Sequence, residues 1–340
     1  MQTRDGGPRT GLTALTMTLA LAAGTIADTP PTPADPEQPP ARFALEQADG
    51  RVRVLLNGDL FTEYVHADTP RPMLYPVIGP HGIPMTRNFP MRRVPGEASD
   101  HPHHRSLWFA HGDVNGIDFW ADGDNRGRIV HEAILATEAS PNGAVITARN
   151  RWVAPDGRTV CTDERTMRFS GTPSARCIDI AITLIASEGE LRLGDTKEGT
   201  MAIRMHPNLR LRNDPGRGVT TANGKAINSE GQRDGDLWGK RARWIDYHGQ
   251  IDGKTVGIAI FDHPDNPRHP TWWHARDYGL VAANPLGIHD FERKPAGTGD
   301  MVIPAGERVT FRWRFVFHEG DAETADIEGM YDAWLRQNDE

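Results

Sequence analysis

The segment from Val309 to Phe317 constrains the fold of this chain most strongly. Apolar or aromatic side chains occupy every second position in it, and Thr310, Arg312 and Arg314 lie between them. A period of two residues is typical of a β-strand that buries one face and exposes the other. The chain therefore needs a second layer to cover the apolar face of this strand.

Shorter strand patterns recur along the chain, in residues 43–56, 61–66, 144–153, 160–169, 178–184, 201–205, 256–261 and 278–283. The segment 67–99 is rich in Pro, Gly and Arg and is expected to form long loops. Only the C-terminal segment carries a helical stripe, with Asp321 or Thr324 as its cap. Because no βα alternation and no Gly-rich nucleotide loop occur, we expect an all-β fold: a large antiparallel sandwich or barrel with a C-terminal helix.

The first 42 residues are typical of an exported protein. Arg4 and Arg9 precede a short apolar run, residues 12–23, and Ala27 ends a plausible cleavage motif. We predict a signal peptide at 1–27, a Pro-rich linker at 28–42 and a single domain at 43–340. The mature protein is then periplasmic or secreted, with no membrane span.

The net charge limits the kinds of binding partner, and the two cysteines raise the question of a disulfide. A formal net charge of −8 argues against nucleic acid, which requires a basic surface. Cys161 and Cys177 are the only cysteines. An oxidising compartment permits a disulfide between them. A simple hairpin centred near Pro173 would not place them opposite each other, so both free and paired thiols stay open.

Residues 100–111 contain four histidines beside Arg105 and Trp108. Imidazoles exchange protons near neutral pH, so this density favours a polar functional pocket over an exposed loop. We assign catalysis to His103 and His104, and substrate binding to the other polar and aromatic side chains of the cluster, Arg105, Trp108 and His111. On a strand, His101 and His103 would share a face that suits a metal ion. No cofactor is required by the sequence, and a metal stays an alternative.

Two further stretches carry charged pairs. Glu198 and His206 flank a predicted strand and can act as base and acid if they share a cleft. The alternative for Glu198 is a solvated loop. Arg241 and Arg243 lie on one side of another strand, where two guanidiniums can clamp a carboxylate or simply face solvent.

A third stretch, residues 270–279, combines aromatic and charged side chains. Adjacent tryptophans on a strand point to opposite faces, so one belongs to the core and one to a pocket. Tryptophan beside charged groups is the composition of a sugar subsite, and we predict that four residues of this stretch bind substrate: Trp273, His274, Arg276 and Asp277. Ordinary core tryptophan is the alternative.

The segments 100–112 and 272–279 resemble a bacterial family of exported proteins labelled "PmoA-like", over about residues 43–336. A membrane-bound oxygenase subunit would need apolar spans that are missing after residue 27. The histidine segment is also distantly similar to galactose mutarotase (aldose 1-epimerase) and its relatives, which implies a β-supersandwich that acts on sugars. That resemblance matches His103 or His104 to the first catalytic histidine and His206 to the second. The C-terminal carboxylate base has only Glu292 as a weak match, and Glu198 is the substitute.

Together these observations predict an exported carbohydrate-active protein that performs His/Glu acid–base chemistry on a sugar or a uronate-containing glycan, as a lyase, hydrolase or epimerase. One alternative is a non-catalytic carbohydrate-binding protein of the same fold. Another is a metal-dependent enzyme that uses the histidines as ligands. A Ser-His-Asp hydrolase is disfavoured because no Gly-x-Ser-x-Gly motif occurs.

Overall fold

Most of the alternating sequence patterns form β-strands in the computed structural model, which describes residues 42–338. These residues lie within one compact unit, residues 40–340. The predicted signal peptide and residues 28–41 of the predicted linker lie outside the described residues. No helix between residues 42 and 338 is long and apolar enough to cross a membrane.

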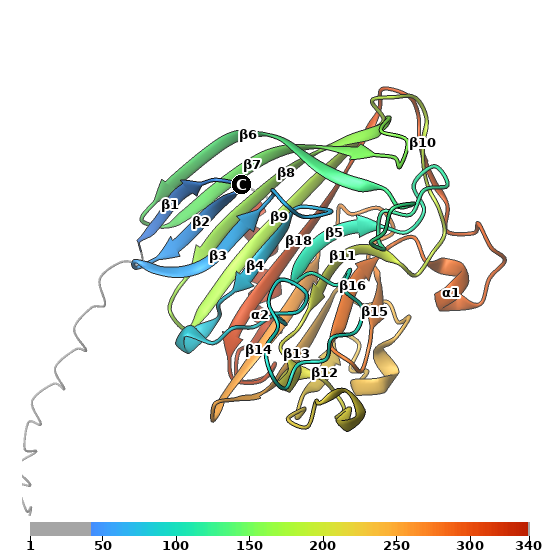
Figure 1. Ribbon diagram of the computed structural model, residues 1–340. Helices are drawn as coiled ribbons and strands as arrows, with labels where there is room; N and C mark the ends of the chain where they lie inside the picture. The colour runs from blue at the N-terminus through green and yellow to red at the C-terminus, as the bar shows by residue number, and fades with distance from the viewer. Residues whose placement is uncertain (1–41, 339–340) are drawn as a thin grey trace, which may run out of the picture. The chain divides into compact units, whose positions relative to one another are not determined.

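Two eight-stranded antiparallel sheets form the frame (Figure 1). The first sheet has the strand order β1 (Phe43–Ala48), β2 (Arg51–Leu56), β3 (Asp59–Val65), β4 (Met73–Val77), β5 (Leu107–His111), β11 (Gly199–Arg204), β16 (Leu280–Asn284) and β15 (Trp272–Ala275). The second sheet has the order β12 (Lys225–Asn228), β13 (Trp244–Ile251), β14 (Lys254–Asp262), β18 (Arg308–Glu319), β9 (Ala175–Ile185), β8 (Thr159–Gly171), β7 (Gly143–Val153) and β6 (Arg128–Ser140). This arrangement confirms the all-β antiparallel class.

The remaining elements are short or peripheral. A third, two-stranded sheet pairs β10 (Leu191–Leu193) with β17 (Met301–Ile303). The helices are α1 (Ile288–Glu292) and α2 (Ile327–Asn338), and the 3₁₀ turns are η1 (Pro80–Gly82), η2 (Pro207–Leu209), η3 (Pro215–Arg217) and η4 (Asp234–Leu237).

The main core lies between the two large sheets. Phe109 of β5 meets Trp152 of β7 and Trp313 of β18, with ring centroids 5.9 Å apart in both pairs. Phe61 of β3 meets Phe169 of β8 at 6.0 Å. Aromatic side chains from the alternating faces therefore interdigitate, as sheet-on-sheet packing requires.

The outer face of the second sheet is covered in part by α2. Phe261, Val316 and Trp334 belong to a second, smaller apolar cluster beneath this helix. The predicted C-terminal helix is thus confirmed, but its predicted start is wrong. Asp326 accepts a hydrogen bond from the backbone N–H of Gly329, whereas Asp321 bonds the Thr324 N–H in the preceding turn.

The structure corrects one further expectation and decides one that the sequence left open. Residues 67–99 contain β4 and η1 and are not wholly loop. Cys161 and Cys177 are both free. Cys177 of β9 lies opposite Ser170, while Cys161 of β8 lies opposite Trp152, so the hairpin register keeps the two thiols apart.

Candidate functional site

The candidate site is a cavity of about 430 Å³ on the face of the first sheet that points away from the main core. In register across this sheet, His274 lies beside Ala282, Ala202 and Trp108. Their neighbours along the strands face the other way: Phe109, for example, meets Trp152 and Trp313 of the second sheet. The cavity is lined by His101, His103, His104, Asp118, Trp120, Ala121, Lys197, Glu198, His274, Arg276 and Tyr278.

Three of the clustered histidines enter the cavity from the loop before β5. They do not lie on a strand, so the expected common strand face of His101 and His103 is wrong. The ring of His104 stacks on Trp108 at 5.6 Å and on His101 at 4.7 Å. His103 meets His104 edge-on at 4.4 Å. The loop thus presents several imidazoles within one small volume.

A buried network of ion pairs around Asp100 holds this loop in place. Asp100 accepts hydrogen bonds from Arg87 at 2.6 Å and from Arg204 of β11 at 2.9 Å. Burial alone would raise the pKa of Asp100, but His101, Arg204 and Arg87 together lower it well below its usual value. Asp100 is therefore a carboxylate that neutralises two buried guanidiniums.

Arg204 also determines the state of His104. Its Nη1 lies 3.1 Å from Nδ1 of His104. A guanidinium only donates, so Nδ1 must accept and the ring proton is on Nε2. Burial first, and then Arg204, His103 and His101, lower the pKa of His104 well below 6.5. His104 is a neutral hydrogen-bond donor at pH 7, with no partner for Nε2 among residues 42–338.

His103 and His274 are neutral at pH 7 as well. Burial, then His101 and Arg71, lower the pKa of His103 to about 4. Burial, then Arg276 and Lys197, lower the pKa of His274 to about 3. These rings can donate and accept hydrogen bonds to hydroxyl groups without carrying charge at neutral pH.

We predict that nitrogen NMR at pH 7 will find the His104 proton on Nε2. On acidification, His248 should become protonated before His103 and His104. His248 is the internal control, because burial lowers its pKa but bonds to Asp246 raise it above the usual value. A proton on Nδ1 of His104 at pH 7 would contradict the geometry of the Arg204 contact.

Glu198 is the carboxylate of the cavity with an elevated pKa. Burial is the main cause; Asp118 and Asp290 add to it, and Lys197 opposes it. The side chain remains 39% exposed, and its Oε1 lies 3.7 Å from Nζ of Lys197. A carboxyl group whose pKa is raised keeps its proton to a higher pH, and this property suits a group that exchanges protons.

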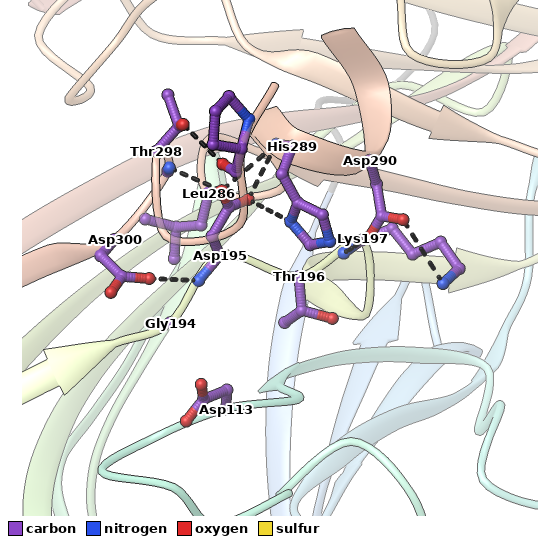
Figure 2. A network of polar contacts seen from close by, with 12 residues as sticks. Asp113, Gly194, Asp195, Thr196, Lys197, Leu286, His289, Asp290, Thr298 and Asp300 are labelled. Atoms are coloured by element: carbon purple, nitrogen blue, oxygen red, sulfur yellow. Dashed lines mark hydrogen bonds and ion pairs between the residues drawn. The ribbon is translucent and has the colours of Figure 1, made fainter. Parts of the chain in front are cut away.

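The segment that carries Glu198 is held by the loop around α1 (Figure 2). The buried Asp195 accepts bonds from the backbone N–H groups of His289 and Gly299, and it lies 2.9 Å from Nδ1 of His289. Asp290 accepts the backbone N–H of Lys197 at 3.0 Å. Two carboxylates therefore fix the backbone just before Glu198, which limits how far this side chain can move.

Arg276 and Tyr278 complete the opposite wall. The Arg276 guanidinium lies 5.4 Å from the Tyr278 ring centroid. It has no carboxylate partner within residues 42–338, and Asp277, the next residue in sequence, pairs with Arg212 instead. Burial raises the pKa of Tyr278, with Arg276 and Arg204 opposing. The cavity therefore holds a cation that has no counter-ion in the described part of the chain, beside a protonated phenol.

The structure brings together five of the residues selected from the sequence: His103, His104, Glu198, His274 and Arg276. It places His206 elsewhere. Glu198 and His206 lie beyond opposite ends of β11, and a strand of six residues separates its ends by about 20 Å. His206 instead accepts the Asn208 N–H at the start of η2, so it is not the acid partner of Glu198 in this cavity.

The remaining selected residues also have other surroundings. Trp273 is fully buried in the core and donates to Ala242, so it cannot stack on a ligand, and Trp108 is buried beneath His104. His111 faces Gly194. The charged members are bound to protein groups outside the cavity lining: Arg105 to Asp122, Arg241 to the backbone of residues 268–270, and Asp277 to Arg212.

Sequence patterns did not single out Tyr278, Lys197, Trp120 or Asp118. Tyr278 follows Asp277 and Lys197 precedes Glu198, and this proximity to selected residues was the only indication that the sequence offered. Glu292, the weak match for a C-terminal base, accepts the Trp272 indole N–H and does not line the cavity. No group of three or more His, Cys, Asp or Glu in the described part of the chain is arranged to hold a metal ion.

Comparison with solved structures finds distant similarities. A galactose mutarotase-like protein from Lactobacillus casei is 7% identical, with a TM-score of 0.34, over 81% of this chain and 100% of that protein. A galactose mutarotase related enzyme from Lactobacillus acidophilus is 9% identical, with a TM-score of 0.27, over 81% of this chain and 97% of that protein.

Sequence comparison is more specific. No curated protein matches the chain. The expected relationship to PmoA-like proteins stays a prediction. A family model described as "Family of unknown function (DUF6807)" matches residues 51–332, most of the described domain. The chain therefore belongs to the DUF6807 family.

Proposed function

We propose that the cavity binds a uronate-containing saccharide and that Glu198 exchanges a proton with it. The observation that carries this proposal is the placement of Glu198, whose pKa is raised, in one cavity with Arg276, which has no carboxylate partner among the described residues. A general acid or base works best when its pKa is near the working pH. An unpaired guanidinium is suited to a carboxylate ligand.

The other groups of the cavity fit a sugar. The neutral imidazoles of His103, His104 and His274 can form hydrogen bonds with hydroxyl groups without placing a charge in the cavity. Tyr278 adds a phenol and an aromatic ring. Pockets of this kind combine a few convergent polar groups with aromatic surface. A non-catalytic binding protein would use the same contacts but would not need the raised pKa of Glu198.

The proposed reaction starts at the carbon next to the uronate carboxylate. Arg276 binds this carboxylate and so stabilises the negative charge that develops when the neighbouring proton leaves. Glu198 accepts that proton. If the glycosidic oxygen on the next carbon then leaves, protonated by Tyr278 or water, the product is an unsaturated uronate. If a proton returns instead to the opposite face of the same carbon, the product is an epimer.

Replacing Arg276 with Gln tests the substrate class. Hydrogen bonds to charged groups contribute about 1.5–3 kcal/mol, so affinity for oligogalacturonate should fall about 10- to 150-fold. Affinity for neutral galacto-oligosaccharides of the same length should change little. Binding would be measured by calorimetric titration, with Arg212→Gln, an exposed neighbour outside the cavity lining, as the control. Equal losses for charged and neutral sugars would contradict the role of Arg276.

A further inference from the structure

An aromatic pair outside the cores adjoins the cavity at His274. The ring of Trp238 lies 6.4 Å from that of His274, and the ring of Phe291 lies 6.2 Å from it. Trp238 and Phe291 meet edge to face at 5.4 Å. Both rings therefore contact a residue that lines the cavity, although neither ring belongs to the lining itself.

These rings are not part of the hydrophobic core. Both are half-buried, and neither belongs to the apolar clusters between the sheets or beneath α2. The indole nitrogen of Trp238 is buried without a hydrogen-bond partner in the described residues. Aromatic side chains stabilise a fold most when they are fully buried. Rings that stay partly exposed near a polar cavity are therefore better suited to contacting a ligand than to stabilising the fold.

The backbone around Phe291 is built to hold its ring. A Cβ at Gly287 would lie 2.7 Å from the Phe291 ring, and a Cβ at Gly239 would lie 3.3 Å from it. Gly239 also has a φ of +70°, which favours glycine. The chain segments on both sides, residues 234–240 and α1, are therefore fitted to each other at this ring.

Three basic residues lie close to the pair in sequence. Lys240 follows Trp238 after one residue, and Arg293 and Lys294 follow α1; all three are exposed and have no ion pair within residues 42–338. The basic side chains contrast with the chain's net charge of −8. The same segments carry Asp234, Asp290 and Glu292, but these three carboxylates accept bonds from protein groups. The basic side chains, which have no ion pair among the described residues, therefore favour an anionic ligand that extends out of the cavity.

We propose that Trp238 and Phe291 form a second sugar subsite, so that the ligand is an anionic oligosaccharide and not a single sugar. This inference rests on the proposed function of the cavity. One sugar ring occupies the cavity beside Glu198 and Arg276. The next ring lies against the aromatic pair, and its carboxylate faces Lys240 or Arg293.

The test is the dependence of binding on chain length. Wild-type protein would be titrated with galacturonate oligomers of increasing length and with neutral galacto-oligosaccharides of matched length. Affinity should rise at least tenfold from the single sugar to the oligomer, and only for the charged series. Trp238→Ala should abolish this gain, while Trp238→Phe should keep most of it.

Two controls separate the outcomes. Leu135→Ala changes an exposed apolar residue on β6 and should leave the length dependence intact. Thermal unfolding shows whether Trp238→Ala is misfolded. If it is, Trp238→Phe decides whether the aromatic ring is responsible for the gain in affinity with length. A gain with length that survives in Trp238→Ala, or no gain in the wild type, overturns the subsite. Failure of the proposed function gives a different result: length-dependent binding lost in Trp238→Ala, but no turnover by the wild type.

Discussion

Glu198→Gln is expected to lower kcat on a uronate oligosaccharide by about 10²–10⁴-fold, because general acid–base groups contribute a factor of this size. Glutamine keeps the shape of the side chain but cannot exchange a proton. Binding of the same oligosaccharide should change less than tenfold, since Arg276 and the neutral imidazoles are untouched. Steady-state kinetics and calorimetric titration on the same samples would separate the two effects.

The control for this variant is Glu188→Gln. Glu188 is exposed between β9 and β10 and does not line the cavity. It should leave both kcat and affinity unchanged. Full activity in Glu198→Gln would contradict the assignment of the proton-transfer group, and loss of binding together with activity would point to a structural role for Glu198.

Asp100→Asn is expected to lower the free energy of unfolding by about 3–5 kcal/mol, the usual effect of breaking a buried ion pair by removing one partner. Arg87 and Arg204 are almost completely buried, and both bond the same oxygen of Asp100. Asparagine cannot neutralise them. Denaturant unfolding at pH 7 measures the loss. The control is the exposed Asp156→Asn, whose carboxylate contacts Arg158 and no other residue between 42 and 338.

The same carboxylate determines how this difference varies with pH. The pKa of Asp100 is lower in the folded protein than its ordinary value near 3.9 in the unfolded chain. Its stabilising contribution is therefore complete above about pH 4 and is lost as the pH falls toward the folded pKa. The stability gap between wild type and Asp100→Asn should be constant from pH 5 to 7 and shrink below pH 4.

Strands with regular alternation could be predicted from the sequence. Cys161, Asp163, Arg165, Met167 and Phe169 occupy every second position of the predicted strand 160–169, and all five are buried in β8. By contrast, β6 contains two register shifts against β7 and an irregular burial pattern, so its residues show no clear period. Local pattern predicts strands only where the pairing is regular.

The site could be predicted only in part, for a similar reason. The histidines and Glu198 were recognised from composition, but composition does not show which face a side chain occupies. Trp273 and His274 are adjacent and yet point to the core and to the cavity, respectively. Arg204, which determines the tautomer of His104, is one hundred residues away from it in sequence, and no local pattern connects the two.

We propose that this histidine-lined cavity performs proton transfer on a uronate. The most direct measurement is to incubate the wild-type protein with a mixture of oligouronates and follow unsaturated-uronate absorbance, reducing ends and proton NMR in one series. The account predicts unsaturated or epimerised uronate with the wild type and a loss of that product in Glu198→Gln. Oligouronates that bind but remain unchanged in all three readings would contradict it and would identify a binding protein instead.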